Sequence, residues 1–291
     1  MQLGRLGVWY AVDRLRPDEL HRLLKTVEDL GYATLWYPES TGYESFSVAS
    51  FMLAHTRSLK IGSSIANIYA RDAFTSRRGL IGMTRMYDSR FILGLGVSHA
   101  PMVEGLRGHN YGRPVPAMRD YLDLLYKDQE VTGASGSAGW QIMLAALGPV
   151  MLRLAFERTR GALPYNTTPQ HTRRAKAAMP DGSQLAVEQK FIIETDPARA
   201  RALGRAELSR YMVLPNYRNH WLRIGFSEAE LEAGGSDRFI DAMVNWGSVN
   251  AVKSQIQAHF DAGATHVCLQ PVHEAGDFAA RDAMLKSMAD T

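Results

Sequence analysis

The chain has 291 residues, of which 46% are hydrophobic, and a formal net charge of +3. This length is normal for an α/β barrel, which typically needs about 250 residues, and so small a charge does not favour a nucleic-acid partner. The longest apolar run, at residues 142–147, is far below the ~20 residues that cross a bilayer, so we expect no membrane span. Because the first residues lack the features of a secretory signal and a single cysteine, Cys268, excludes an internal disulfide, we expect a cytoplasmic protein.

Apolar periodicity predicts strands and helices that alternate along the chain. The expected elements begin with a strand at 6–11, a helix at 17–30, a strand at 34–37, a helix at 45–55, a strand at 59–65, a helix at 72–88 and a strand at 91–96. After a long polar loop at 97–114 come a helix at 116–126, a Gly/Ser-rich flexible link at 132–139, a strand at 142–147, a helix from Pro149, a strand at 162–165, a helix at 169–179 and a strand at 185–193. A helix-rich segment at 197–247, irregular at 215–221, precedes a helix at 249–262, a strand at 265–270 and a helix at 279–289.

Eight strands that alternate with helices predict parallel strands joined by right-handed crossovers. In one chain of this length they favour a closed (β/α)8 TIM barrel, with residues 1–291 as a single domain and 197–247 as a helical, insertion-like segment before the last strand. The active site of such a barrel lies at the C-terminal ends of the strands. The candidate residues are therefore those in the loops there: Glu39 and Ser40, residues 67–71, 97–113, Gly148 and residues 166–171.

The turn at Gly148 and Pro149 joins an apolar run directly to an amphipathic helix. Proline suits the first turn of a helix, and glycine lets a ligand or another backbone come close. The free N–H groups of that turn predict an anion site, with phosphate as the natural guest. An ordinary strand-to-helix turn explains the same residues.

Two side chains at the predicted strand ends are candidates for acid–base chemistry. His99 follows Gly94 and Gly96, which lack the third glycine of a dinucleotide fingerprint but allow a flat ring to lie against the strand end. A histidine there can give or take a proton near neutral pH, or can be a loop residue with no role. Glu39 can act as a base, hold a ligand, or brace a neighbouring turn. No His, Asp or Glu grouping has metal-ligand spacing, so we expect no metal.

Seven segments in chain order resemble the luciferase-like monooxygenase superfamily, and within it the branch of oxidoreductases that use the deazaflavin coenzyme F420. The segments are 35–40 (LWYPES), 61–71 (IGSSIANIYAR), 91–99 (FILGLGVSH), 111–114 (YGRP), 145–151 (AALGPVM), 164–172 (PYNTTPQHT) and 261–267 (DAGATHV). The resemblance covers essentially the whole chain.

This resemblance implies a bacterial-luciferase-like TIM barrel that holds F420, or alternatively FMN, at the C-terminal mouth. It implies a non-proline cis peptide in a bulge of the third strand, here Ser64–Ile65, against which the ring packs. Catalysis falls to His99 and Glu39. The implied cofactor-binding residues are Ser64, Ile65, Asn67, Gly96, Val97, Ser98, Gly148, Pro149, Tyr165, Asn166, Thr168 and His171.

The sequence departs from relatives that oxidise sugar phosphates, because Ser40 and His99 stand where those relatives carry a histidine and a glutamate. Their phosphate-binding lysines have no counterpart, and Val150 stands where a basic residue is common. We therefore expect hydride transfer between F420 and another small organic substrate. An FMN-dependent monooxygenase and a non-catalytic deazaflavin- or flavin-binding barrel remain open, and the resemblance also implies a homodimer.

Overall fold

The computed structural model describes residues 2–127 and 141–289. The predicted flexible link at 132–139 lies outside them. The strands are β1 (Leu6–Trp9), β2 (Thr34–Tyr37), β3 (Lys60–Ser63), β4 (Ala66–Asn67), β5 (Phe91–Gly96), β6 (Ile142–Ala145), β7 (Gly161–Leu163), β8 (Gln184–Ile193), β9 (Val244–Gly247) and β10 (His266–Pro271). The helices are α1 (Pro17–Asp29), α2 (Ser45–Ala54), α3 (Ala73–Met86), α4 (Pro114–Tyr126), α5 (Pro149–Arg158), α6 (Pro169–Ala177), α7 (Pro197–Met212), α8 (Pro215–Arg223), α9 (Asp237–Met243), α10 (Val249–Asp261) and α11 (Phe278–Met288), with a π turn η1 (Pro101–Gly105) and a 3-10 turn η4 (Ala229–Leu231).

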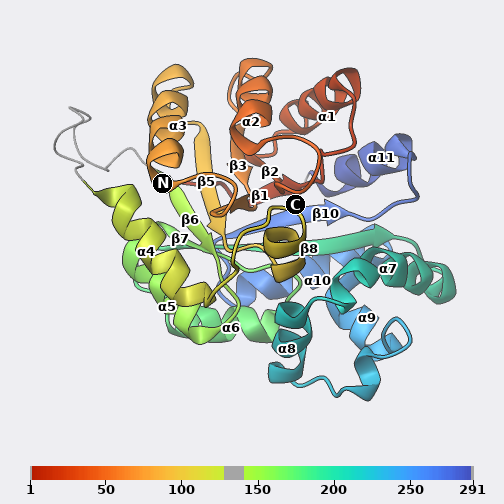
Figure 1. Cartoon of the computed structure of the whole chain (residues 1–291). Helices are drawn as coiled ribbons and strands as arrows, with labels where there is room; N and C mark the ends of the chain where they lie inside the picture. The colour runs from red at the N-terminus through yellow and green to blue at the C-terminus, as the bar shows by residue number, and fades with distance from the viewer. Residues whose placement is uncertain (1, 128–140, 290–291) are drawn as a thin grey trace.

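The strands form a closed parallel barrel. Its order runs β1, β2, β3, β5, β6, β7, β8, and β10 pairs with both β8 and β1 to close the sheet. These eight strands are the eight that the sequence predicts. Figure 1 shows the helices around the barrel, with α1 to α3 on one side and α5, α6 and α10 on the other. None of the helices in the described part of the chain is long and apolar enough to span a membrane.

The third strand is interrupted between β3 and β4. Gly62 lies opposite Ile92 of β5, whereas Ala66 lies opposite Leu95, so the β3–β4 side carries one residue more than β5 over this interval. The peptide bond between Ser64 and Ile65, inside the interruption, is cis. The expected position of the cis bond is therefore confirmed.

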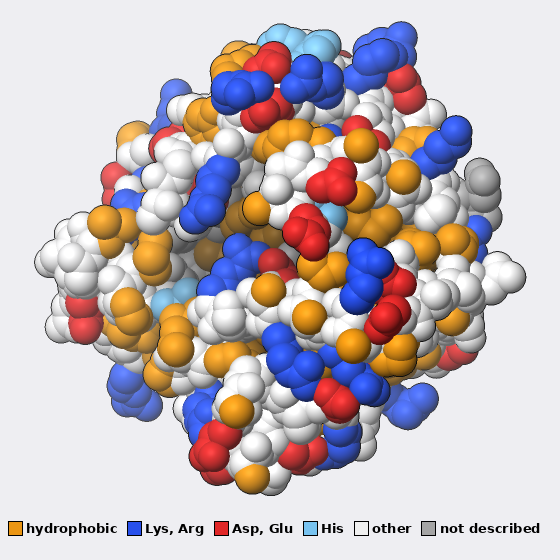
Figure 2. Space-filling model, turned by 90° about the vertical axis from the view of Figure 1, so that its right-hand side faces the viewer, with side chains coloured by type: hydrophobic (Ala, Val, Ile, Leu, Met, Phe, Trp, Pro, Cys, Tyr) orange, Lys and Arg blue, Asp and Glu red, His pale blue; other side chains and the backbone are white. Residues whose placement is uncertain are grey.

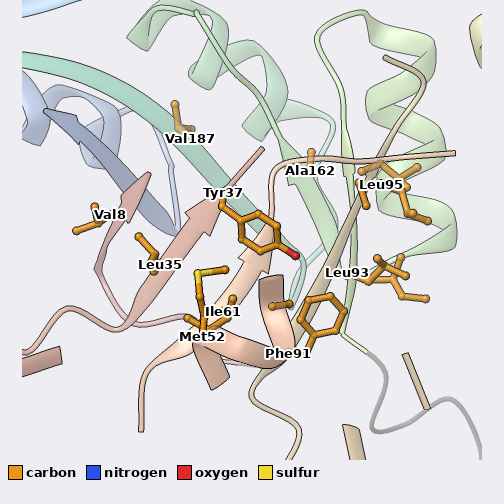
Figure 3. Close-up of a cluster of buried hydrophobic side chains, with 14 of the residues drawn as sticks. Val8, Leu35, Tyr37, Met52, Ile61, Phe91, Leu93, Leu95, Ala162 and Val187 are labelled. Carbon is orange, nitrogen blue, oxygen red and sulfur yellow. The ribbon is translucent and has the colours of Figure 1, made fainter. Parts of the chain in front are cut away.

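Alternate residues of each strand face two different apolar layers. One layer lies between the barrel and its helices, and Figure 3 shows part of it, with Met52 of α2 near Leu35 and Ile61 of the sheet. The other fills the barrel interior with Leu3, Trp9, Trp36, Ile92, Met143, Leu163, Ala186 and Cys268. Because burial raises the pKa of the Cys268 thiol well above its usual value, this side chain is a packing residue. Ile65 and Tyr165 pack on the interior layer while half-buried, so they border the C-terminal mouth.

The segment at 197–247 is where prediction and structure differ most. Residues 215–221, expected to be irregular, belong to the regular helix α8. Polar residues obscure its periodicity, but Tyr217, His220 and Trp221 turn inward, and Trp221 packs against Phe239 in a third apolar cluster. Residues 244–247, expected within the helix-rich segment, form β9, because they pair with the second half of β8. The loop at 97–114 also contains η1.

Candidate functional site

The C-terminal ends of the strands form a hollowed mouth. The arrows of β8 and β10 point to the right in Figure 1, and Figure 2 turns that side toward the viewer. This face is hollowed, with hydrophobic, basic and acidic side chains together in and around the hollow. The predicted site residues lie in the last residues of the strands, in the loops that follow them, or in the first turns of the next helices.

Gly96 and the cis peptide lie against each other at the end of the third and fourth predicted strands. A Cβ atom at Gly96 would lie 2.4 Å from Cγ1 of Ile65, so only glycine permits this approach. Asn67 is buried, and Ser64, Val97 and Ser98 are half-buried beside it. The side chain of Ile65 therefore occupies the space that a side chain at position 96 would take.

Glu39 is held by several donors at the same strand ends. Its carboxylate accepts hydrogen bonds from the backbone N–H of Asn67 at 2.8 Å and of Ser45 at 3.2 Å. Arg71 donates from both terminal nitrogens, with Nη1 at 3.0 Å from Oε2 and Nη2 bonded to Oε1. The Glu39 side chain is only 3% exposed, and both oxygens are engaged. This geometry favours the bracing role for Glu39 over that of a base.

His99 lies apart from this carboxylate, near the start of α8. Its half-buried ring lies 5.7 Å from that of Tyr217, centroid to centroid. Burial lowers the pKa of His99 below its usual value, and a side-chain hydrogen bond with Asn216 partly offsets that effect. The imidazole is therefore neutral at pH 7 and has a lone pair with which to accept a proton.

The Gly148 turn carries more positive charge than the sequence predicts. Gly148 is the N-cap of α5, and a Cβ atom there would lie 3.4 Å from Nη1 of Arg223 in α8. His171 lies behind the turn, with Nε2 2.9 Å from the carbonyl oxygen of Leu147. Burial lowers the pKa of His171, and Arg223 acts in the same direction. Arg223 thus supplies a cation at the turn where Val150 does not.

Tyr165, Asn166 and Thr168 form the wall between that turn and the barrel interior. Thr168 caps α6 by accepting a hydrogen bond from the N–H of His171. Asn166 has a positive φ of 54°, and its Oδ1 accepts a hydrogen bond of 2.6 Å from Nζ of Lys190. Lys190 also donates to Glu188 at 3.2 Å inside the barrel. Burial raises the pKa of Glu188 and lowers that of Lys190, so each charge depends on the other.

Three buried polar atoms on these walls have no hydrogen-bond partner among the described residues. They are Nε1 of Trp9, Nδ2 of Asn166 and Nδ1 of His171. Their residues are 4%, 2% and 4% exposed, so solvent does not compensate them fully. Because Nε2 of His171 faces a carbonyl oxygen and carries the proton, Nδ1 is an acceptor, whereas the other two atoms are donors. The described residues therefore leave two donors and one acceptor unsatisfied here.

Several residues at the mouth were not predicted from the sequence to be site residues. They are Trp9, Lys190, Tyr211, Tyr217, Arg223 and Gln270, which come from three strands and two helices. The charged residues at alternate positions in β8 are the one local signal, because charge inside an otherwise apolar strand marks an inward-facing polar group. In the described part of the chain, no group of three or more His, Cys, Asp or Glu residues is arranged to hold a metal ion.

Comparison with known proteins identifies relatives of this barrel. The family model described as luciferase-like monooxygenase matches residues 2–266. A Mycobacterium tuberculosis protein provisionally named a coenzyme F420-dependent oxidoreductase is 27% identical in an alignment of length 201 that covers 58% of this chain and 57% of that protein. The alignment thus spans little more than half the length of that relative.

Solved structures share the fold at low sequence identity. The coenzyme F420-dependent tetrahydromethanopterin reductase of Methanopyrus kandleri superposes with a TM-score of 0.72 at 17% identity, covering 99% of this chain and 98% of that chain. The oxygenating constituent of 3,6-diketocamphane monooxygenase from Pseudomonas putida, in complex with FMN, has a TM-score of 0.72 at 16% identity, covering 98% and 96%. Both cofactor types therefore occur among barrels of this shape.

Proposed function

Because the chain belongs to the luciferase-like monooxygenase family of oxidoreductases, we propose that it transfers a hydride between coenzyme F420 and a small organic substrate. The observation that carries this proposal is the one-residue bulge between β3 and β4, where Ile65 lies directly against Gly96 at the mouth of the barrel. The relative named for F420 supports F420 as the cofactor. When bound, the deazaflavin supplies the site that gives or takes the hydride, at C5.

The seat for the ring is the one-residue bulge around Ser64 and Ile65. Asn67, Gly96, Val97 and Ser98 surround it, and the engaged carboxylate of Glu39 holds this backbone in place. Rigid support of this kind fixes a flat ring relative to a substrate, which is how a protein contributes to hydride transfer. In this proposal Glu39 is a positioning residue.

In this proposal the first turn of α5 would hold the phosphate of the cofactor. Gly148 and Pro149 leave the first N–H groups of that helix free, and the guanidinium of Arg223 adds a full positive charge beside them. Thr168 and His171 continue the same wall, followed by Tyr165 and Asn166. The unpartnered donors of Trp9 and Asn166 suit the carbonyl and hydroxyl oxygens of a deazaflavin.

His99 moves the proton that accompanies the hydride. Its neutral imidazole at pH 7 accepts a proton from a substrate hydroxyl when the substrate is oxidised, and returns it in the reverse direction. The ring lies beside Tyr217, which keeps it near the mouth. This assignment makes His99 the catalytic acid–base residue of the proposal.

Fluorescence titrations of the purified protein with F420 and, separately, with FMN test the cofactor. We expect saturable binding of F420. We also expect the anaerobic turnover to fall about 10²-fold or more in His99→Ala, while the affinity of that variant for F420 is unchanged. Unchanged turnover in that variant removes His99 from the mechanism.

The FMN-bound structural relative supports a second candidate, an FMN-dependent monooxygenase. It requires binding of FMN alone and consumption of oxygen. Saturable binding of either cofactor without turnover of any substrate identifies a binding barrel instead. The proposal includes a small-molecule substrate, which is not yet identified, and a homodimer. Sedimentation equilibrium tests whether the protein is a dimer.

A further inference from the structure

Five aromatic rings follow one another across the mouth. Trp9 at the end of β1 lies 5.1 Å from Tyr165 after β7, measured between ring centroids. Tyr165 lies 5.5 Å from Tyr211 of α7, which lies 5.3 Å from Tyr217 of α8. His99 completes the row at 5.7 Å from Tyr217. Trp9 and Tyr217 are buried, whereas Tyr165, Tyr211 and His99 are half-buried, and the accessible parts of these three rings suit a substrate with an apolar or aromatic body.

A chain of hydrogen bonds runs behind this aromatic row. The hydroxyl oxygens of Tyr211 and Tyr165 are 2.6 Å apart. The Tyr165 hydroxyl lies 2.9 Å from Oε1 of Gln270, and Nε2 of Gln270 donates to Glu207 at 2.9 Å. Arg210 donates to the same carboxylate oxygen of Glu207. The chain therefore begins at a tyrosine of the mouth and ends at a carboxylate.

The carboxylate fixes the direction of every bond in the chain. Because Glu207 is an acceptor, Gln270 must turn its amide N–H toward it and its carbonyl oxygen toward Tyr165. Tyr165 therefore donates its single proton to Gln270, and its oxygen accepts the proton of Tyr211. Burial raises the pKa of both phenols, so both keep their protons at neutral pH.

The proton of Tyr211 is thus committed to Tyr165, but its oxygen still has a lone pair. Among the described residues its hydroxyl has a hydrogen-bond contact only with Tyr165, and the side chain is half-buried at the mouth. Lys190 lies 4.0 Å above the Tyr165 ring centroid and 5.2 Å from that of Tyr211, which helps to hold the pair in place. A ligand beside Tyr211 therefore meets an acceptor, not a donor.

We propose that Tyr211, oriented by Tyr165, Gln270 and Glu207, binds a second hydroxyl group of the substrate, distinct from the one whose proton His99 accepts, and that this second group donates a hydrogen bond to the phenolic oxygen. The substrate class is thereby an alcohol with at least two hydroxyl groups and an apolar or aromatic body. A carbonyl group, which only accepts hydrogen bonds, gains nothing at this position. This inference rests on the proposed function, because it names the substrate group that the same site accepts.

Matched probe pairs test the inference by binding alone. The pairs are 1-phenylethanol with acetophenone and cyclohexanol with cyclohexanone, which differ in donating or accepting a hydrogen bond. Calorimetric titration measures the affinity of each probe for the cofactor-free protein. The titrations are repeated with protein that carries a cofactor with which the probe cannot react, namely F420H2 for the alcohols and F420 for the ketones. The alcohol of each pair is expected to bind about three- to tenfold more tightly, the scale of one net hydrogen bond.

Two variants separate recognition from structural support. In Tyr211→Phe the alcohol preference is expected to fall to within about twofold, with the ketone affinity nearly unchanged. In Glu207→Gln the direction of the hydrogen bonds from Gln270 to Tyr211 is no longer fixed. The preference for the alcohol over the ketone should therefore also fall, although Tyr211 is present. Tyr32→Phe is the matched control, because its hydroxyl bonds to the carbonyl oxygen of Leu285, outside the mouth, and it should keep the preference.

Equal binding of alcohol and ketone by the unaltered protein, or saturation by neither member of either pair, overturns the inference. So does a Tyr211→Phe variant that keeps the full preference. The cofactor-free titrations give these results independently of F420. A protein that binds the alcohols but not F420 refutes the proposed function alone, and one that binds F420 without the preference refutes only the assignment of Tyr211.

Discussion

Replacing Glu39 by glutamine distinguishes a brace from a catalytic base. The side chains of Arg71 and Glu39 are 8% and 3% exposed, so their ion pair is screened little by solvent. Glu39→Gln keeps an oxygen for the N–H of Asn67 but leaves the buried guanidinium with a neutral amide and with its remaining pair to Glu44, whose side chain is 48% exposed. Removing one partner of a buried pair typically costs about 3–5 kcal/mol. For a chain of this length that corresponds to a fall in Tm of about 5–8 °C.

The assay is thermal unfolding followed by circular dichroism, with turnover measured at a temperature where both proteins are folded. A brace predicts the loss in Tm and a turnover within about tenfold of the unaltered protein. Arg71→Met should destabilise to a similar extent, and the double variant should lose much less than the sum of the two, because neither charge is then left alone. Arg199→Met is the control, since its exposed pair with Glu194 is worth less than about 1 kcal/mol.

An unchanged Tm together with a turnover reduced by about 10²-fold or more would refute this reasoning. Glu39 would then be the base that the sequence left open. Additive losses in the two single variants would also contradict the pairing, because residues that share one interaction are expected to couple.

Three other variants test separate parts of the molecule. Burial lowers the pKa of His266 to about 4, below its unfolded value of about 6.5. The contribution of the neutral ring to stability is therefore complete above pH 6.5 and is lost as the pH falls to 4. Over this window the free energy of unfolding changes by at most about 1.4 kcal/mol per pH unit. The free energy of unfolding, measured with urea at several pH values, should depend less steeply on pH in His266→Gln than in the unaltered protein. Identical pH dependences would contradict the assignment. Gly96→Ala should displace Ile65 and weaken F420 binding about tenfold or more in a folded protein, measured by fluorescence titration, and unchanged affinity would remove this contact from the seat. Arg223→Met should weaken F420 binding about tenfold at low salt and less at high salt, whereas Arg199→Met should not, and a loss independent of salt would argue against a phosphate contact.

Local sequence patterns were sufficient for the strands and helices of the barrel. Apolar periodicity and glycine and proline punctuation depend on residues close together in the chain, so the eight strands could be located without any tertiary contact. The Gly148 turn is of this kind, because strand, turn and helix are continuous there. The same patterns failed for α8, whose inward-facing residues are separated by polar ones, and for β9, which is a strand because β8 lies beside it.

The sequence by itself determined the barrel, the end of it at which the site lies, and which loops contribute to that end. The resemblance to a known family located the cis peptide. Only the tertiary structure decided what the individual side chains do there. Both oxygens of Glu39 are engaged because Arg71 reaches them, and the Gly148 turn has a cation beside it because Arg223 lies there. The physical reason is that hydrogen bonds and ion pairs depend on distances of a few ångströms between residues far apart in the chain, and these distances exist only once the barrel has closed.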